Sequence, residues 1–350
     1  MPTTALVTGA AGFIGSHLVE ALAADGCAVR SLVLPGTTPT NLQGVDTELV
    51  WGDIREPSTL SPALDGVDTV YHLAALSRHD ARVPDAEYHD VNVLGTRNVL
   101  AAADAAGVRR LLFTSTIEAV GMSPDGRPLT EDTPQQPRNI YGRTKLEAEH
   151  MVLAFAARRA LRTVVVRPPM TYGPREMLLA ARLFKPIQFG FCPLVGDGLA
   201  LMECCYVKNM VRGIRLAAER GPDKSVFFIA DERSYTFREI VEAIARELGV
   251  RVHTPRIPVP LAYALGWTAE LAGRVLPFHP FLVRQTGRPP FSRKTVAWTK
   301  ESRMFVDIGK ARRELGYQPA YTLQDGLRET IAWYRQHGHL HPAARRTQEP

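Results

Sequence analysis

The chain has 350 residues, of which 45% are hydrophobic and 22% charged, and its formal net charge is +6. This composition is ordinary for a soluble globular protein and excludes disorder as the main state. The length exceeds what one core usually takes, so we expect a large domain and a smaller one. The positive charge is small and scattered, without a long basic run, and gives no indication of nucleic-acid binding.

The four cysteines, Cys27, Cys192, Cys204 and Cys205, are not spaced as metal ligands, and we expect free thiols in a reducing cytoplasm. The first residues lead straight into a strand pattern, with no secretory signal. Residues 259–283 form the most apolar later stretch, but charged residues and prolines interrupt it, so no integral membrane span is expected. This stretch covers a pocket, rests on a membrane surface as a peripheral contact, or belongs to the core.

The first half of the chain alternates short β-branched runs with amphipathic helical patterns, which is typical of βαβ units. Glycines 26 and 107 stand where such helices end. Strands are expected at residues 5–8, 28–34, 48–51, 69–73, 110–114 and 163–167, and helices at 16–24, 92–106 and 141–160. We therefore predict an α/β fold of the Rossmann type, with a doubly wound parallel sheet.

The pattern changes after Pro168 and Pro169. Residues 1–172 are expected to form the NAD(P)-binding domain, with a strand and helix near 206–232 returning to it, and residues 173–338 a smaller, mostly helical substrate-binding domain. Residues 171–198 are rich in Gly and Pro and predict loops around a site. The later patterns are a strand at 226–229, a helix opened by the capping pair Thr236 and Glu239, helices at 307–315 and 322–337, and a polar tail at 339–350.

A glycine-rich turn, TGAAGFIG at residues 8–15, stands between the first strand pattern and the first helix pattern. Glycines there allow a tight turn and a close approach of backbone to a pyrophosphate, and the helix N-terminus directs free N–H groups at the phosphates. The alternative is a glycine-rich structural turn. We predict dinucleotide binding at Gly9, Gly12, Phe13, Ile14 and Gly15.

The residues that usually separate NAD from NADP are not decisive in this chain. Near Leu34, at the end of the second strand, there is neither an acid for the adenosine ribose nor an arginine for a 2′-phosphate. Thr37 and Thr38 could bond to either form, and NAD is only slightly favoured over NADP. Asp53, followed by Ile54, either accepts a hydrogen bond from the adenine amino group or caps a helix.

Tyr141 and Lys145 are four residues apart in a helix pattern and share one face of it. A free phenol, with a pKa of about 10, is no base at neutral pH, but a nearby cation favours its ionised form. Thr114 and Thr116, at the end of a parallel strand, supply hydroxyls where α/β folds place their sites. A Tyr-x-x-x-Lys spacing alone also occurs on solvated helices; together with the glycine turn and these hydroxyls it predicts a proton-transfer site.

The motifs occur in an order that resembles the extended short-chain dehydrogenase/reductase superfamily over residues 3–335: the glycine turn, HLAA at 72–75, NVLGT at 92–96, TST at 114–116, Y-x-x-x-K at 141–145 and RPP at 167–169. The resemblance implies that Tyr141 is the general acid/base, that Thr116 orients the substrate oxygen, and that Lys145 binds the nicotinamide ribose. It implies that Asn92 supports the site. Further cofactor contacts are implied at Leu73, Ala74, Ala75, Thr114 and the backbone after Pro168.

Two groups of this superfamily compete. Dehydratases among the sugar-nucleotide enzymes carry an Asp-Glu pair in the hydroxyl segment; the positions compared here, Ser115 and Thr116, hold no acid, so elimination is not expected. Residues 114–121, 206–209, 227–231 and 307–317 look instead like segments of 3β-hydroxysteroid dehydrogenases and related bacterial hydroxyketone reductases.

Between residues 178 and 207 the only cations are Arg182 and Lys185, whereas a sugar diphosphate needs several donors. The apolar residues of this stretch either line a pocket for a bulky substrate or form the core of the small domain: Phe184, Ile187, Phe189, Phe191, Leu194 and Leu199. We predict a dehydrogenase or reductase that moves a hydride between nicotinamide and a secondary alcohol or ketone of a bulky, apolar small molecule. The alternatives are an NDP-sugar 4-epimerase and a non-catalytic NAD(P)-binding regulator.

No metal site is expected, because His72, His79 and His89 lack ligand spacing. For Glu118, near the site in sequence, a structural or solvated role is favoured over substrate contact. The resemblance implies a homodimer packed through the helix that carries Tyr141. Its alanines would allow close packing: Ala148, Ala154, Ala156 and Ala157.

Overall fold

The computed structural model describes residues 3–77, 83–156, 161–275, 296 and 304–341. Its centre is a parallel sheet of seven strands in the order β11-β6-β5-β4-β1-β2-β3. The strands are β1 (Thr4–Thr8), β2 (Ala28–Val33), β3 (Glu48–Trp51), β4 (Thr69–His72), β5 (Arg110–Thr114), β6 (Arg162–Arg167) and β11 (Ser225–Phe228). This arrangement confirms the Rossmann-type fold expected from the sequence.

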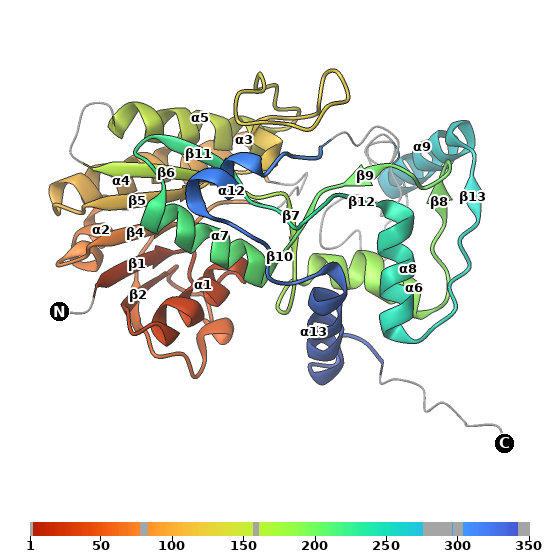
Figure 1. Ribbon diagram of the computed structural model, residues 1–350, viewed down its shortest axis with the longest axis horizontal. Coiled ribbons are helices and arrows are strands. Elements are labelled where there is room, and N and C mark those ends of the chain that lie inside the picture. The colour runs from red at the N-terminus through yellow and green to blue at the C-terminus, as the bar shows by residue number, and fades with distance from the viewer. Residues whose placement is uncertain (1–2, 78–82, 157–160, 276–295, 297–303, 342–350) are drawn as a thin grey trace.

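Helices cover both faces of the sheet (Figure 1). α1 (Phe13–Ala24), α7 (Val207–Arg220) and α12 (Gly309–Leu315) lie on one face, and α2 (Pro57–Leu64), α4 (Gly95–Ala105) and α5 (Ile140–Ala156) lie on the other. Each face has its own hydrophobic core, and successive strand residues alternate between them. In β1, for example, Val7 packs under α1 and α7, whereas Leu6 packs under α2 and α4.

Short turns complete the first domain: η1 (Thr40–Leu42), α3 (Asp85–His89), the π-helical turn η2 (Asp90–Leu94) and the 3₁₀ turn η3 (Ile117–Ala119). The helix expected at 92–106 therefore begins as a π-helical turn and becomes α-helical at Gly95. On α5, Ala148 is wholly buried in the chain's own core and so is not an interface residue, contrary to expectation, whereas Ala154 is exposed. The side chain of Ala156 and all of Ala157 lie outside the described residues.

The second domain is built from short pairs of strands and several helices. Its elements are β7 (Met170–Tyr172), η4 (Ala180–Phe184), α6 (Lys185–Gln188), β8 (Leu194–Val195), β9 (Leu201–Met202), β10 (Cys204–Tyr206), β12 (Tyr235–Thr236), α8 (Phe237–Leu248), β13 (Arg256–Ile257), α9 (Val259–Val275) and α13 (Leu323–Gln336). β7 pairs with β10, β9 with β12, and β8 with β13. Both capping bonds expected between Thr236 and Glu239 are present at the start of α8.

The prediction of loops throughout residues 171–198 is wrong for the short strands β7 and β8 and for η4 and α6. Ala180, Leu183, Phe184 and Ile187 have helical spacing, and all four enter the core of the second domain. The flanking Gly and Pro residues hid this short helical segment. Cys204 and Cys205 point to opposite sides of their strand, because Cys204 packs in this second core and Cys205 in the core of the first domain.

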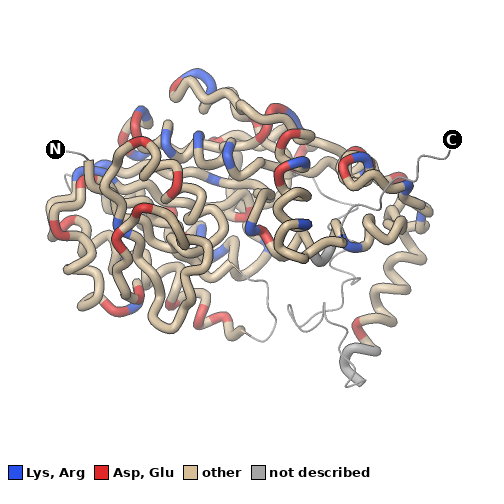
Figure 2. Tube along the Cα trace, turned by 90° about the horizontal axis from the view of Figure 1, so that it is seen from below, with Lys and Arg blue, Asp and Glu red and all other residues tan. Residues whose placement is uncertain are grey.

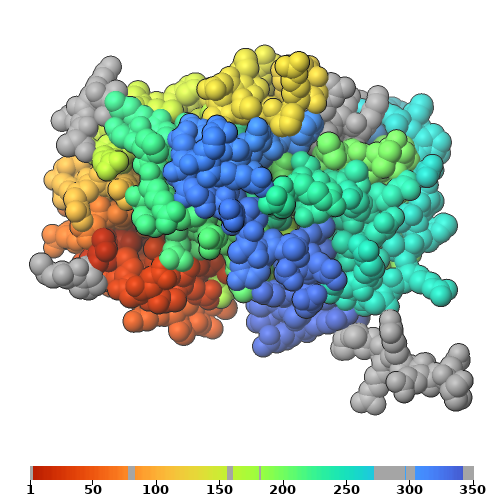
Figure 3. Space-filling model, viewed as in Figure 1, coloured from red at the N-terminus to blue at the C-terminus, as the bar shows by residue number. Residues whose placement is uncertain are grey.

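The chain passes between the two domains more than once. β11 joins the sheet beside β6, and a late segment, residues 308–317, packs on the first core through Ile308, Ala311, Leu315 and Tyr317. The sequence assigned that segment to the substrate-binding domain. In Figure 3, the blue α12 accordingly lies against the green α7, on the side of the red and orange first domain.

None of the helices in the described part of the chain combines the length and the apolar character needed to span a bilayer. α9 covers the first part of the apolar stretch at 259–283, and residues 276–283 lie outside the described residues. Acidic and basic residues are interspersed along the trace (Figure 2).

Candidate active site

The glycine turn lies at the carboxyl ends of β1 and β4, where the strand order of the sheet reverses. Gly9 has a φ of +69°, and a Cβ there would lie 2.8 Å from the backbone nitrogen of Ala74. A Cβ on Gly15 would collide with the carbonyl oxygen of Gly9. Because Gly12 precedes α1 and offers no side-chain cap, the first N–H groups of α1 are left to a ligand.

A buried chain of hydrogen bonds joins the ends of β1 and β4 behind the glycine turn. Thr8 Oγ1 accepts from the backbone N–H groups of Leu73 (3.2 Å) and Ala74 (3.1 Å), and lies 2.7 Å from His72 Nδ1. With both acceptor positions used, the Thr8 hydroxyl donates to Nδ1. Nε2–H then donates to Thr96 Oγ1 at 3.0 Å, because the Thr96 hydroxyl donates to the Asn92 carbonyl.

His72 is therefore a structural link and not a metal ligand. Burial, and then the charge of Lys145, lower its pKa to about 3, so the imidazole stays neutral. His89 lies at the surface, with Nε2 3.4 Å from Glu147 Oε1, and His79 lies outside the described residues. Among the described residues, no group of three or more His, Cys, Asp or Glu side chains is arranged to hold a metal.

Asp53 follows β3 and makes a surface ion pair. Its Oδ1 accepts from the backbone N–H of Arg55 at 2.9 Å, and its Oδ2 lies 2.5 Å from Arg55 Nη2. The N-cap of α2 is Glu56, so Asp53 does not cap that helix. At the end of β2, Leu34 is 49% exposed, and Thr37 and Thr38 are also exposed.

The loop after β3 is fixed against α4 by contacts that the sequence did not reveal. Asn98 Nδ2 donates to the carbonyls of Ile54 (3.0 Å) and Arg55 (3.2 Å). A Cβ on Gly95 would lie 2.6 Å from Cδ1 of Ile54, which is buried. Asn98 and Gly95 thus set the position of the segment that was expected to meet the adenine.

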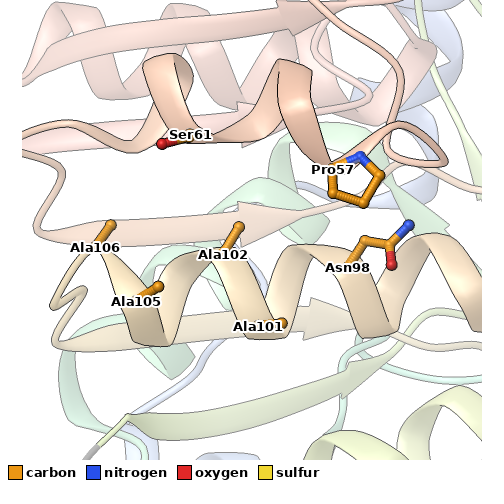
Figure 4. A pocket seen from close by; sticks show the side chains of 7 residues that line it. All are labelled: Pro57, Ser61, Asn98, Ala101, Ala102, Ala105 and Ala106. Atoms are coloured by element: carbon orange, nitrogen blue, oxygen red, sulfur yellow. The ribbon is translucent and has the colours of Figure 1, made fainter.

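Asn98 also lines a surface hollow of about 340 Å³ between α2 and α4 (Figure 4). Its other lining residues are Pro57, Ser61, Ala101, Ala102, Ala105 and Ala106. This hollow lies on the outer side of the helix layer, and neither Tyr141 nor Lys145 lines it, so it is not the candidate active site.

Tyr141 lies in the first turn of α5 and is half-buried. Its side chain is hydrogen-bonded to that of Thr116, just after β5. Burial and the nearby Glu118 carboxylate raise the pKa of the phenol above its ordinary range, and the bond to Thr116 acts in the opposite direction. The phenol is therefore protonated at neutral pH in the free protein.

Lys145 lies one turn further along α5 and is 1% exposed. Its Nζ is 4.1 Å from the centre of the Phe113 ring, which comes from β5. Burial lowers the pKa of Lys145 to about 7, and the Glu149 carboxylate acts in the opposite direction. Charged and neutral forms of this lysine are thus close in free energy near neutral pH.

The start of α5 is fixed by Asn139, which the sequence did not single out. Asn139 Oδ1 accepts from the N–H of Gly142 at 2.7 Å, and its Nδ2 donates to Glu118 Oε2 at 2.5 Å. A Cβ on Gly142 would collide with the carbonyl oxygen of Glu118. The sequence argument against elimination of water rested on the lack of an acid at Ser115 and Thr116. The structure shows that one carboxylate nearby, that of Glu118, raises the pKa of Tyr141.

Asn92 lies in the π-helical turn η2 and supports the same end of α5. Its Nδ2 donates to Thr144 Oγ1 at 3.0 Å, and its side chain also bonds to both backbone groups of Leu76. Thr144 in turn donates to a carbonyl of the first turn of α5. These contacts agree with a supporting role for Asn92.

The segments that follow β5 and β6 are hydrogen-bonded to each other beside the three hydroxyl residues Thr114, Ser115 and Thr116. The N–H of Ile117 donates to the carbonyl of Pro168 at 2.9 Å. Thr114 Oγ1 and Ser115 Oγ are buried, with no hydrogen-bond partner among the described residues. Unpaired buried hydroxyls are costly, and the glycine turn leaves room that a Cβ would fill, so these residues fit a bound dinucleotide.

The parallel sheet, the glycine turn and the Tyr141–Lys145 helix together define a dinucleotide-dependent enzyme of the extended short-chain dehydrogenase/reductase type. Residues 5–230 match the NAD dependent epimerase/dehydratase family, and the chain belongs to that family. The enzymatic function expected from the sequence is thereby confirmed, and of the two cofactors left open there, NAD is the one on which the family depends.

The chain is similar to relatives of differing activity. It is 35% identical to a 4-hydroxy-2-methyl-3-oxo-4-farnesyl-3,4-dihydroquinoline-1-oxide ketoreductase of Stigmatella aurantiaca, over 92% of this chain and 93% of the relative. It is 32% identical to a 3 beta-hydroxysteroid dehydrogenase/Delta 5→4-isomerase of Mycobacterium tuberculosis, over 94% and 90%. Its fold matches a dTDP-glucose 4,6-dehydratase of Streptomyces venezuelae, solved with NAD bound, with a TM-score of 0.77 and 29% identity over 98% and 100% of the chains.

Proposed function

We propose that this protein is an NAD-dependent oxidoreductase that interconverts a secondary alcohol and a ketone on a bulky, apolar substrate. The observation that carries the proposal is the hydrogen bond between Tyr141 and Thr116, with Lys145 one turn further along the same helix. Two hydroxyls this close together suit a single substrate oxygen, which the reaction protonates or deprotonates.

NAD supplies the acceptor or donor of the hydride when it is bound. Thr116 orients the substrate oxygen, and Tyr141 exchanges a proton with it. The raised pKa of Tyr141 keeps its proton available for reduction of a ketone. Oxidation of an alcohol requires the phenol to lose that proton, which the charge of Lys145 favours.

We further propose that the cofactor contacts predicted from the sequence hold for this chain. They are Gly9, Gly12, Phe13, Ile14, Gly15, Asp53, Ile54, Leu73, Ala74, Ala75, Thr114, Tyr141, Lys145 and Pro168. The close approach of Gly9 to Ala74 and the unpaired Thr114 hydroxyl support the set. The exposed end of β2 holds neither an acid nor an arginine, so NADP is tested beside NAD.

The relatives support an apolar substrate, because the names of two of them specify a farnesylated quinoline and a hydroxysteroid. The apolar residues of the second domain support an apolar substrate only in part, because half of those singled out in the sequence are core residues. Phe184, Ile187 and Leu194 belong to its core, whereas Phe189, Phe191 and Leu199 are exposed by 73%, 51% and 55%. The substrate class therefore rests mainly on the relatives.

The experiment is a spectrophotometric assay with NAD⁺ or NADP⁺ and a panel of hydroxysteroids and other bulky secondary alcohols, with the matching ketones in reverse. Tyr141→Phe is expected to lower turnover by about 10²–10⁴-fold, the usual contribution of a general acid/base, while NADH binding is retained. Tyr71→Phe is the matched control, because Tyr71 is buried in the first core. Undiminished turnover by Tyr141→Phe would refute the proposal.

An NDP-sugar 4-epimerase is the second candidate, and membership of the epimerase/dehydratase family favours it. Epimerisation leaves no net reduced cofactor, whereas the proposed reaction accumulates it in proportion to product. Interconversion of a UDP-sugar without net reduction would establish the epimerase. A binding-only regulator would show neither, and its cellular role would survive Tyr141→Phe.

We propose that the protein is a homodimer that packs through α5. Ala154 is exposed on that helix, with Arg143, Glu147 and His150 also on its exposed side. Light scattering of the purified protein gives the mass, and a monomer at micromolar concentration would refute this proposal.

A further inference from the structure

A buried ion pair lies behind the part of α5 that carries Tyr141 and Lys145. Glu149 is one turn beyond Lys145 and is 0% exposed. Arg167, the last residue of β6, is 1% exposed and holds both carboxylate oxygens, with Nη2 2.5 Å from Oε1 and Nε 3.2 Å from Oε2. A buried pair is weak evidence for stability, because desolvation offsets most of its attraction, so a different role deserves a test.

On the sheet side of Lys145, the contacts that the described residues make with it supply no negative charge. β5 contributes the ring of Phe113, 4.1 Å from Nζ. β4 contributes His72, which burial keeps neutral and whose pKa Lys145 itself helps to lower. The last residue of β6, Arg167, is a permanent cation and pairs with Glu149.

Three carboxylates lie in this part of the protein, and they act on different groups. Glu118, after β5, acts on the phenol of Tyr141. Glu131 accepts the N–H of Phe228 at 2.9 Å through Oε1, and its backbone carbonyl lies 3.5 Å from Arg167 Nη1. Glu149 is the carboxylate that acts on Lys145.

We propose that Glu149, held in place by Arg167, is a positioning residue that keeps Lys145 charged in the dry interior beside Tyr141. This inference rests on the proposed function in taking Tyr141 and Lys145 as the pair that handles the proton and the cofactor ribose. Because the Arg167 guanidinium donates to both carboxylate oxygens of Glu149, it fixes the direction of that carboxylate. Lys145 lies one turn before this carboxylate on the same helix and is buried with it.

Replacing this anion has a consequence of definite sign. In Glu149→Gln the burial of Lys145 is no longer opposed, so the lysine loses its proton at a lower pH than in the wild type. NADH affinity that depends on the ammonium then weakens at a lower pH. If the protein turns over an alcohol, the phenol loses the support of a cation, and the pH of half-maximal oxidation rises.

The experiment is a calorimetric titration of the full chain with NADH at pH values from about 5 to 9, which bracket the Lys145 pKa of about 7 and a midpoint about one unit lower. Glu149→Gln is expected to shift the midpoint of the affinity loss down by about one pH unit, a tenfold change in affinity between the two midpoints. Glu147→Gln is the matched control, because Glu147 is exposed on the same helix and contacts His89. Glu149→Asp, which keeps the anion, should recover most of the wild-type profile.

A second variant guards against loss of folding, since Glu149→Gln leaves Arg167 buried with no anion. Glu149→Gln with Arg167→Met removes both charges, and buried pairs commonly tolerate neutral replacement. A folded Glu149→Gln variant with the wild-type midpoint would overturn the inference. The double variant is compared with Arg167→Met alone, since these two proteins differ only in the anion, and equal midpoints in that pair would overturn it as well. A shifted midpoint in a protein whose turnover survives Tyr141→Phe would overturn the proposed function and leave this inference standing.

Discussion

Gly9 and Gly26 have nearly the same backbone conformation, with φ of +69° and +78°, but very different surroundings. At Gly26 a Cβ would meet nothing within 4 Å, whereas at Gly9 it would lie 2.8 Å from the nitrogen of Ala74. The need for glycine at Gly26 is therefore conformational. At Gly9 it comes from the close packing of two strand ends that form the cofactor turn.

Alanine substitutions separate these two causes. Gly26→Ala is expected to cost about 1–2 kcal/mol of unfolding free energy, the usual cost of a left-handed conformation, and to leave NADH affinity unchanged. Gly9→Ala adds the collision with Ala74, so we expect a loss above about 3 kcal/mol and NADH affinity weakened at least about tenfold. Urea denaturation and NADH titration check both; equal effects of the two substitutions would contradict the packing argument.

Residue types and spacings in the sequence were enough to predict the glycine turn, Thr116, Tyr141 and Lys145, because these belong to local patterns. Thr8 and Asn98 were not predicted as site residues, because their partners are distant in sequence. Asn139 and Glu149 were also not predicted, since the partners Glu118 and Arg167 lie outside their local patterns. Asn98, for example, bonds to residues 43 and 44 positions earlier in the chain. A pattern along the chain carries no record of such pairings.

At the scale of secondary structure, α5 is the element that brings the site together. Its first turn packs against η3 at Gly142, where only a residue without a Cβ avoids the carbonyl oxygen of Glu118. The distance between Tyr141 and Thr116 depends on this contact, because Tyr141 precedes Gly142 and Thr116 is the N-cap of η3.

Gly142→Ala is expected to push the first turn of α5 away from η3. A displacement of about 1 Å can lower turnover by about 10²-fold, so we expect a large loss of kcat with NADH affinity changed less than about twofold. Arg143→Ala, at the next and exposed position, is the control and should keep wild-type kcat. Steady-state kinetics with the best substrate of the panel decide, and an unchanged kcat in Gly142→Ala would show that the turn adjusts elsewhere.

Most strands of the sheet begin and end within a residue or two of the expected positions, because buried parallel strands are short, continuous apolar runs bounded by polar residues. The small elements were harder to predict. α2 has Pro57 at its start and Pro62 inside it, which obscure a helical pattern, and η4 and α6 are flanked by Gly and Pro. In these elements tertiary burial outweighs local preference.

At the scale of the whole molecule, Asn209 joins parts of the chain that are far apart. Its side chain is 0% exposed and donates to Asp231 Oδ1 (2.7 Å) and to the Tyr321 carbonyl (2.8 Å). It also accepts from the N–H groups of Ala320 (2.9 Å) and Tyr321 (3.1 Å). One amide thus connects α7, the end of β11 and the segment that leads into α13.

Asn209→Ala removes four hydrogen bonds made by one wholly buried side chain. Since each such bond contributes about 0.5–1.5 kcal/mol net, we expect unfolding free energy to fall by about 3 kcal/mol. Gln324→Ala is the comparison, because that exposed amide bonds to Glu247 at the surface and its loss should cost less than about 0.5 kcal/mol. Thermal unfolding by two probes measures both, and a similar small loss in the two variants would contradict this role for Asn209.

The interleaving of the chain limits how this protein can be recombined with its relatives. A cut at residue 172 would leave β6 as an open edge and remove α7 and α12 from one face of the sheet. The second domain is instead made of three stretches that share one core: the stretch between β7 and β10, the stretch that begins at β12, and α13. A graft from a relative therefore has to replace all three stretches together, with the sheet and its glycine turn carried over intact.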